Sequence, residues 1–287
     1  MKKAIGTIIG SLIFILIILA VFSSIFFITN QMFNLFSNQI TKLSFESEKQ
    51  SEKLEIISSA FNKYLPKRFL INAAASSSGN IFSLIKPLDD NYLTLTGTIL
   101  GINYFTNVTF NFEEIELVGS MTEIRIGIVF SYDILASLTQ RVYIFNRITN
   151  SWELVDTSSF TTTILFSQKV ITVANPNNYI LPNSTVKVRI FASSAAFFKA
   201  YYDYISLKIE NNDPIKFAIT YILNNSPFSS KIVSVVVFNS TTFQREDLNI
   251  TIPSSSLFLI KIKTYIINSN IKFITDLGNI FQATISN

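Results

Sequence analysis

Acidic side chains are the groups in this sequence best suited to catalysis. They occur as close neighbours at three places, Asp89/Asp90, Glu113/Glu114/Glu116 and Glu246/Asp247. Glycoside hydrolysis by general acid–base chemistry needs two carboxylates that face one cavity. Because successive side chains of a strand point to opposite faces, Glu114 and Glu116 could cooperate on a strand, whereas Glu113 and Glu114 could not. Charged residues are mostly exposed, so the pattern favours a solvated face over a glycosidase site.

The composition excludes most other catalytic chemistry. The 287 residues contain no Cys and no His, which removes thiol nucleophiles, imidazole bases, Cys/His zinc sites and Ser-His-Asp triads. No Gly-rich phosphate loop or metal-binding motif occurs. The net charge of +4 comes from Lys and Arg scattered among Asp and Glu, which does not indicate a nucleic-acid partner. We therefore expect a protein that is not an enzyme and has no cofactor.

The first 30 residues are typical of a membrane-spanning helix. No residue from Ala4 to Thr41 is charged, and residues 5–28 are almost continuously Ile, Leu, Phe, Val and Ala. About 24 helical residues rise about 36 Å, which exceeds the roughly 30 Å of a hydrocarbon core. No small-residue cleavage pattern follows Ile28. We therefore expect the helix to remain as a signal-anchor over residues 1–30.

The flanking charges predict the orientation of this helix. Lys2 and Lys3 lie before it, and the first charge after it is Lys42. The positive-inside rule then places the N-terminus in the cytoplasm. The sequence predicts a single-pass protein of the cell membrane, with the residues after about 30 outside the cell.

Lys3, Ala4 and Ile5, followed by the apolar helix, resemble the class III signal of archaeal type IV pilins and pilin-like membrane proteins. In that family a peptidase cuts on the cytoplasmic side of the hydrophobic segment and leaves the helix attached. The resemblance implies processing between Ala4 and Ile5. It also implies a filament as one fate of the protein, with the apolar helices bundled in its core.

A three-four spacing continues beyond the membrane segment and predicts an amphipathic stalk helix over residues 31–66. The spacing runs through Phe33, Phe36, Ile40, Leu43, Ser47, Gln50, Leu54, Ile57, Phe61 and Tyr64. Pro66 would end the helix. The apolar seam could pair with a second copy or pack against the protein's own domain, so self-association through the helix is one expected interaction.

From Phe69 onward the pattern changes to alternation, as in TEIRIGIVFSYDI. Strands recur about every ten residues with no long helical pattern between them, which predicts antiparallel sandwiches. The polar cluster at residues 211–214 indicates a domain boundary. The sequence therefore predicts a mainly β protein with one long N-terminal α-helix. It places two antiparallel β-sandwich domains at residues 67–211 and 212–287.

Two further resemblances concern these sandwiches. A strand with Trp152, followed by Arg189 and Asp203 on later strands, resembles the galactose-binding-like jelly rolls over about residues 70–210. Such domains often hold sugars or a calcium ion in their end loops, but no loop here has a compact cluster of oxygen ligands. The final strand, with Thr275 and Gly278, resembles the small immunoglobulin-like domain that closes many archaeal surface proteins.

Two kinds of site are predicted outside the membrane. Trp152, Tyr201 and Tyr202 could form a sugar-stacking platform, although 14% of the chain is aromatic and most rings must lie in the core. Five sequons predict N-glycosylation, and the alternative is chance in a chain rich in Asn and Thr. The sequons begin at Asn107, Asn183, Asn224, Asn239 and Asn249.

Together these features predict a membrane-anchored extracellular protein with a structural or adhesive role, either a pilin-like filament subunit or a component associated with the surface layer. The first alternative is a cell-surface carbohydrate-binding module. A surface protein of an archaeal virus and a glycosidase that uses Glu114 and Glu116 are the remaining hypotheses. The expected partners are the membrane, further copies of the chain, glycans and surface-layer proteins, but no nucleic acid.

Overall fold

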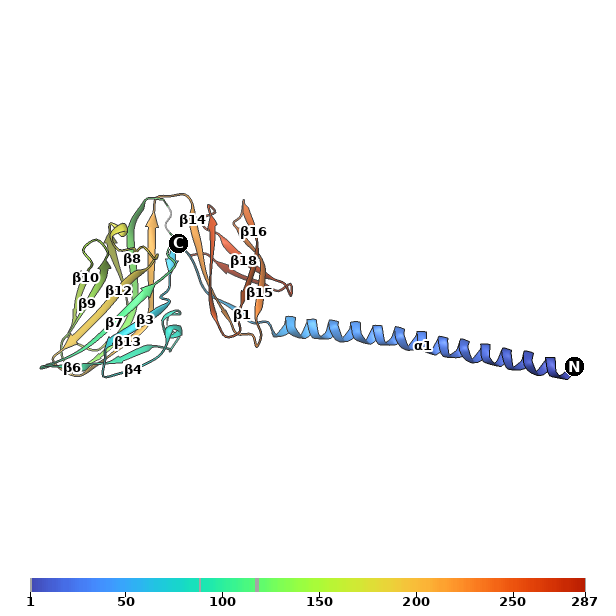
Figure 1. Ribbon diagram of the computed structural model, residues 1–287. Coiled ribbons are helices and arrows are strands. Elements are labelled where there is room, and N and C mark those ends of the chain that lie inside the picture. The colour runs from blue at the N-terminus through green and yellow to red at the C-terminus, as the bar shows by residue number, and fades with distance from the viewer. Residues whose placement is uncertain (1, 88, 117–118, 287) are drawn as a thin grey trace. The chain divides into compact units, whose positions relative to one another are not determined.

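The computed structural model describes residues 2–87, 89–116 and 119–286 (Figure 1). The chain divides into two compact units, residues 1–52 with 277–279, and residues 53–276 with 280–287. The side chains of Lys3, Ala4 and Ile5 lie outside the described residues. Processing between Ala4 and Ile5 therefore stays a prediction.

Helix α1 (Lys2–Ser51) forms most of the first unit. Its side chains from Ile13 onward are exposed, including large apolar ones such as Phe22, Phe26 and Phe33. By length and composition the helix could span a membrane, although a signal sequence would pass the same test. The helix thus supports the expected location and leaves its orientation a prediction.

The helix ends earlier than the sequence predicts, so the prediction of a stalk helix to residue 66 is wrong. Residues Leu54–Phe61 form strand β1 and Lys63–Tyr64 form strand β2. Strand β1 pairs with β14 (Lys216–Asn224), a distant partner that local periodicity cannot reveal. At the helix end, the Asn279 side-chain amide donates to the Lys49 carbonyl at 2.8 Å and so satisfies one of the last carbonyl groups.

The larger sandwich consists of two antiparallel sheets, which contain the strands between residues 63 and 211. The β12 sheet has the order β10-β9-β12-β7-β3, with β6 beside β7 (Figure 1). Its strands are β3 (Arg68–Ala73), β6 (Thr98–Leu100), β7 (Asn103–Phe112), β9 (Leu138–Asn146), β10 (Ser151–Phe160) and β12 (Val186–Ser194). The β13 sheet has the order β11-β8-β13-β5-β4, with β2 beside β13. Its other strands are β4 (Ser76–Ser78), β5 (Leu93–Thr96), β8 (Met121–Ile134), β11 (Ile164–Ala174) and β13 (Phe198–Asn211).

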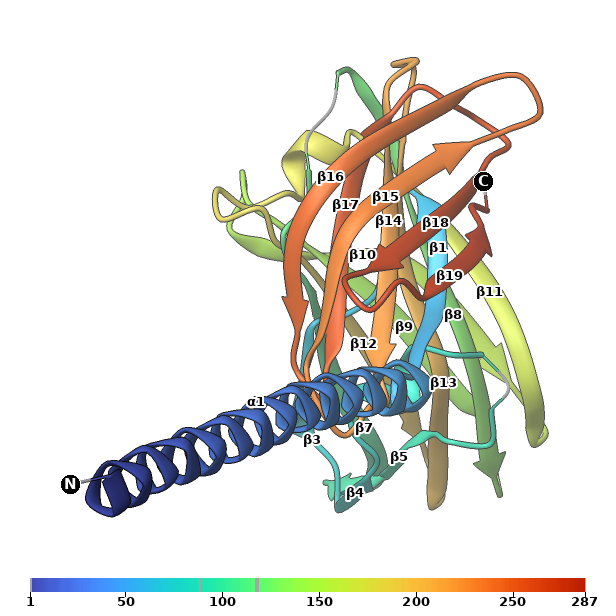
Figure 2. The ribbon, with the colours of Figure 1, turned by 90° about the vertical axis from the view of Figure 1, so that its right-hand side faces the viewer.

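The smaller sandwich also has two antiparallel sheets. In the β14 sheet, β14 lies between β1 and β17 (Leu257–Thr264). The β15 sheet has the order β16-β15-β18-β19 and faces the viewer in Figure 2. Its strands are β15 (Ser230–Phe238), β16 (Phe243–Ile252), β18 (Asn270–Thr275) and β19 (Ile280–Thr284). This architecture confirms the mainly β fold class. The boundaries 67–211 and 212–287 and the immunoglobulin-like assignment stay predictions.

A buried polar network crosses the apolar core of the larger sandwich. The Tyr132 hydroxyl, on β8, donates to Gln140 Oε1, on β9, at 2.5 Å and lies 3.3 Å from the Tyr202 hydroxyl, on β13. All three side chains are fully buried, and burial raises the pKa of Tyr202 to about 12. Since β8 and β13 belong to one sheet and β9 to the other, the network joins the two layers.

Removing the Tyr132 hydroxyl tests the contribution of this network. We expect Tyr132→Phe to lower the free energy of unfolding by about 1–3 kcal/mol, because Gln140 loses its buried donor. Chemical denaturation of the full chain in non-ionic detergent, followed by Trp152 fluorescence, measures this loss. The matched control is Tyr201→Phe at the half-buried neighbour of Tyr202, which we expect to change stability by less than about 0.5 kcal/mol. Equal losses in both variants would contradict the proposed contribution.

Candidate functional site

The outer face of the β12 sheet, here called the β12 face, carries aromatic and cationic side chains that contact one another. Along β12, Val188 and Ile190 are fully buried in the core, whereas the alternate residues Lys187, Arg189 and Phe191 are only partly buried. The register of the neighbouring strands extends this alternation across the sheet. The face includes Leu70, Phe105, Asn107, Thr109, Arg141, Tyr143, Phe145, Trp152, Leu154, Lys187, Arg189 and Phe191.

A cation stacks on the only tryptophan of the chain at one side of this face. The Arg189 guanidinium lies 3.8 Å from the centroid of the Trp152 ring. Phe145, opposite Trp152 in the strand pair, meets it edge to face with the ring centroids 5.4 Å apart. Lys187 Nζ lies 5.7 Å from the Phe145 centroid. Two cations of β12 therefore lie against two aromatic rings of the neighbouring strands β9 and β10.

A second aromatic pair and two amides occupy the opposite side of the face. Phe105 and Phe191 stack with their centroids 5.9 Å apart and an interplanar angle of 29°. The Asn72 side-chain amide donates to Asn107 Oδ1 at 3.1 Å and to Thr109 Oγ1 at 2.8 Å. Apolar ring surfaces beside fixed amide and hydroxyl groups are the elements of which sugar-binding surfaces are made.

The β12 face is electropositive because its cations have no acidic neighbours on the same strands. The sequences of β3, β6, β7, β9 and β12 contain no Asp or Glu. The two carboxylates of β10, Glu153 and Asp156, lie opposite the inward-facing residues Ile144 and Val142. Glu153 accepts hydrogen bonds from Asn146 and Tyr179, and Asp156 pairs with Lys169.

The predicted platform of Trp152, Tyr201 and Tyr202 does not form a single surface. Only Trp152 belongs to the β12 face. Tyr202 is fully buried in the core, while Tyr201 lies on the β13 sheet and meets Tyr92 edge to face at 6.3 Å. Adjacent residues of a strand point to opposite sides, so Tyr201 and Tyr202 cannot share a surface. Stacking of a sugar on Trp152 remains a prediction.

Arg189 and Phe145 are neighbours of Trp152 that were not predicted from the sequence. The short Asn-rich turn between two alternating segments could have placed Trp152 opposite Phe145. The length of a short hairpin loop fixes the register of the two strands that it connects. Arg189 reaches this position only through the pairing of β12 with β9, which joins segments far apart in sequence. No local pattern indicates that pairing.

The five sequons differ in their exposure. Asn183 and Asn249 are exposed, and Asn107 is partly buried within the β12 face. Asn224 is fully buried, and its side-chain nitrogen donates to the carbonyls of Phe228 and Ile252 at 3.0 and 2.9 Å. A glycan on that nitrogen would break both hydrogen bonds. Occupancy of the five sites stays a prediction.

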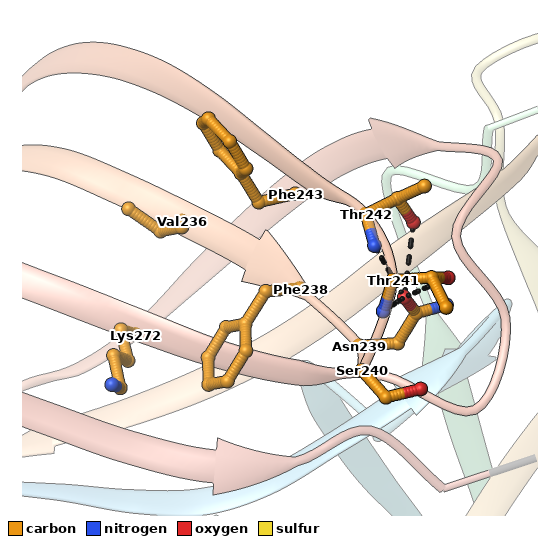
Figure 3. Close-up of a pocket in the computed structure, with 8 residues that line it drawn as sticks. All are labelled: Val236, Phe238, Asn239, Ser240, Thr241, Thr242, Phe243 and Lys272. Carbon is orange, nitrogen blue, oxygen red and sulfur yellow. Dashed lines mark hydrogen bonds between the residues drawn. The ribbon is translucent and has the colours of Figure 1, made fainter.

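Asn239 begins the turn between β15 and β16, beside a surface hollow of about 490 Å³ (Figure 3). Its Oδ1 accepts hydrogen bonds from the backbone and hydroxyl groups of Thr241 and Thr242, which stabilise the turn. Lys272 is the single charged residue of the lining, and its Nζ lies 4.7 Å from the Phe238 centroid. The hollow presents few polar groups toward a ligand, so it is a poorer candidate than the β12 face.

The acidic cluster lies in the turn after β7 and not on a strand, and its residues form ion pairs. Glu114 pairs with Lys67 and Lys261, while Lys261 Nζ also lies 2.9 Å from Glu116. Glu113 pairs with Arg68 at 2.5 Å. Hydrogen bonding to Lys67 lowers the pKa of Glu114, whereas a general acid needs a raised pKa. The geometry therefore gives no support to the glycosidase hypothesis.

A cleft of about 590 Å³ adjoins these ion pairs and is lined by Lys67, Glu114, Tyr221 and Phe258, among others. The Leu65 amide donates to the Tyr221 hydroxyl at 2.8 Å, and burial raises the pKa of that tyrosine. The charged groups of the cleft are already paired with one another, which leaves little to recognise a ligand. Among the described residues, no group of three or more acidic side chains could hold a metal ion.

Comparison with known proteins gives a likeness of fold only. No family model and no curated protein matches the chain. Among solved structures, the CBM22-1-GH10 modules of xylanase 10B from Clostridium thermocellum, complexed with xylohexaose, are 7% identical with a TM-score of 0.35, over 55% of this chain and 29% of that chain. A CBM4 structure is 12% identical with a TM-score of 0.31, over 53% and 95%. A CBM28 module specific for non-crystalline cellulose is also 12% identical, with a TM-score of 0.29, over 52% and 87%.

The electropositive surroundings of Trp152 predict selective fluorescence quenching. Iodide should be enriched at the β12 face and caesium depleted. In the full chain in non-ionic detergent, we expect the ratio of the iodide to the caesium quenching constant to be about twice that of free N-acetyltryptophanamide, or more. Arg189→Gln should lower this ratio, and Lys199→Gln on the β13 sheet should not. An unchanged ratio in Arg189→Gln would contradict the assignment.

The pairing of Glu114 with Lys67 predicts a pH-dependent stability. Because the pKa of Glu114 is lowered in the folded state, its contribution is present above the unfolded value of about 4.3 and is lost as the pH falls through the folded value. Glu114→Gln should therefore lower the urea midpoint at about pH 7 and leave it nearly unchanged at about pH 2. The control is Glu246→Gln, which alters an exposed carboxylate and should change neither midpoint. An equal loss at both pH values would show a packing effect instead.

Proposed function

We propose that this chain is a membrane-anchored surface protein that binds glycan chains on the β12 face. One observation carries the proposal, which is the joint presence of partly exposed rings and fixed polar groups on one sheet surface. Trp152, Phe145 and Phe191 supply apolar ring surfaces, and Asn72 and Asn107 supply amides. Sugar rings have apolar C–H faces and polar edges, and they match both components.

The extent of the face suits a polysaccharide better than a single sugar. Aromatic pairs lie on β9–β10 and on β12–β7, on both sides of the centre of the sheet. Leu154 and Leu70, on the outer strands β10 and β3, are 50% and 61% exposed. The hollow and the cleft described above are lined by residues outside this face. On the face itself, a polymer lying across the strands would make the most contacts.

The anchor in this proposal is helix α1, with the N-terminus in the cytoplasm and the sandwiches outside the cell. The uncharged stretch up to Thr41 and the lysines at positions 2 and 3 support it. A surface protein held by one helix and able to bind glycans would act as an adhesin or as a link to a surface layer. This role joins the adhesive and carbohydrate-binding hypotheses.

Three finer hypotheses about origin and assembly accompany the proposal. The order Lys3, Ala4, Ile5 before an apolar helix supports a pilin-like subunit that is processed after Ala4. The exposed sequons at Asn183 and Asn249 support an archaeal glycoprotein of the cell surface. A surface protein of an archaeal virus would need the same anchor and the same binding face.

A polysaccharide panel tests the proposed function. The full chain, in micelles of a polyoxyethylene detergent that carries no sugar, is offered xylan, mannan, a mixed-linkage β-glucan and polygalacturonate. We expect measurable binding to at least one, and about tenfold weaker binding by Trp152→Ala, because a stacking surface is lost. Phe243→Ala removes an aromatic ring that is 73% exposed on β16 and should leave the affinity unchanged. Failure to bind any member of the panel would refute glycan binding.

A further inference from the structure

Three cations lie close together at the centre of the β12 face. In the pairing of β12 with β9, Arg189 is opposite Tyr143 and Arg141 is opposite Phe191. Arg141 and Arg189 are therefore diagonal neighbours on one face, with their Cα atoms about 7–8 Å apart. Lys187 precedes Arg189 by two positions on the same strand and lies about 7 Å from it. Three positively charged side chains thus start from neighbouring backbone positions between the two aromatic pairs.

None of these three cations forms an ion pair with a carboxylate of the described residues. The outer face of the β13 sheet differs, because Arg125 pairs there with Glu123 and Glu210. Lys199 on the same β13 sheet forms no ion pair with a described carboxylate either, but it lies opposite Asp133 of β8. The β12 face differs because its three cations are neighbours on strands whose sequences contain no Asp or Glu. An anionic partner from outside would supply the missing charges.

The position of Arg189 suits an anion in particular. Arg189 is partly buried among its neighbours, and this desolvation lowers its pKa. Its guanidinium lies over the Trp152 ring, and its Nε donates to Thr109 Oγ1 at 3.5 Å. These two contacts hold the planar group in place, and the terminal N–H groups are its remaining donors. Those donors match the two oxygens of a carboxylate or sulfate group. A neutral sugar would leave this charge without a counter-charge.

We propose that the β12 face selects acidic glycans, meaning polysaccharides whose sugars carry carboxylate or sulfate groups. Arg141, Lys187 and Arg189 bind the acidic groups, and Phe191 contacts the sugar rings together with the side of Trp152 that Arg189 leaves uncovered. This inference rests on the proposed glycan binding and adds the class of ligand. Nucleic acid is a poorer match, because three cations neutralise few phosphates and the charge of the chain is spread over both sheets.

A matched pair of polymers tests this inference. Polygalacturonate and its full methyl ester have the same backbone and differ only in the charge of the carboxyl groups. Dextran sulfate and dextran form a second pair that distinguishes sulfate from carboxylate recognition. The full chain is produced in a bacterium without N-glycosylation, so that Asn107 on the face stays unmodified, and is measured in polyoxyethylene detergent. We expect at least one acidic polymer to bind about tenfold more tightly than its neutral partner, with affinity falling as salt rises.

Single variants assign this preference to the face. Arg189→Gln and Arg141→Gln should each weaken binding of the acidic polymer about tenfold and change binding of a neutral polymer less than twofold, since charge-assisted hydrogen bonds are lost. Lys199→Gln removes the same charge from the β13 sheet and should have no effect. A uniform loss in all three variants would show a non-specific dependence on net charge and would overturn the inference.

The remaining outcomes separate this inference from the proposed function. Equal or tighter binding of the neutral partners would overturn acidic selectivity and leave glycan binding intact. Absence of binding to every polymer, here and in the panel, would refute both. Single-stranded DNA and vesicles with anionic lipids are included as competitors. If DNA or the vesicles displaced the acidic polymer at a concentration of negative charge below that of the polymer, the face would be assigned to that partner instead.

Discussion

Strand β12 lies between β9 and β7, and backbone pairing on both of its edges fixes which side chains share the β12 face. The side-chain period of a strand is two, so a shift of the register by one residue would move Arg189 into the core and Ile190 to the surface. The cost of burying an unpaired guanidinium prevents that shift. The same constraint that forms the apolar core therefore also forms the proposed binding surface.

The polar core of the larger sandwich strengthens this constraint. Tyr132 and Gln140 form a bond between the two sheets in a position where an unsatisfied group would be costly. A packing in which the sheets slid past each other would break it. The acidic turn after β7 has a similar role at the surface, where Glu114 and Glu116 share Lys261 of β17. These carboxylates therefore link the turn after β7 to strand β17.

Local sequence patterns predicted the helix and the alternating strands of this fold. The uncharged run to Thr41 predicted the helix, and strict alternation predicted the antiparallel strands. The same reasoning failed for residues 54–64, where Leu54, Ile57 and Phe61 fit a helical spacing but β1 gains its stability from a partner some 160 positions later. It failed again for Tyr202, because composition cannot tell a core ring from a surface ring. The binding face depends on pairings between distant strands, and a single sequence does not contain them explicitly.

The uncharged stretch of α1 is longer than any single bilayer requires. Residues 4–41 would extend about 57 Å as a helix, whereas a hydrocarbon core is about 30 Å thick. No charge marks the outer boundary of the anchor before Lys42, and Phe33, Phe36 and Ile40 continue the apolar surface beyond one membrane thickness. Asn30, Gln31, Asn34, Asn38 and Gln39 interrupt this surface. Because burying their amides in hydrocarbon is costly, residues 29–41 suit the membrane interface better than the membrane core. In the proposed anchor, side-chain amides and not charges therefore mark the outer boundary of the span.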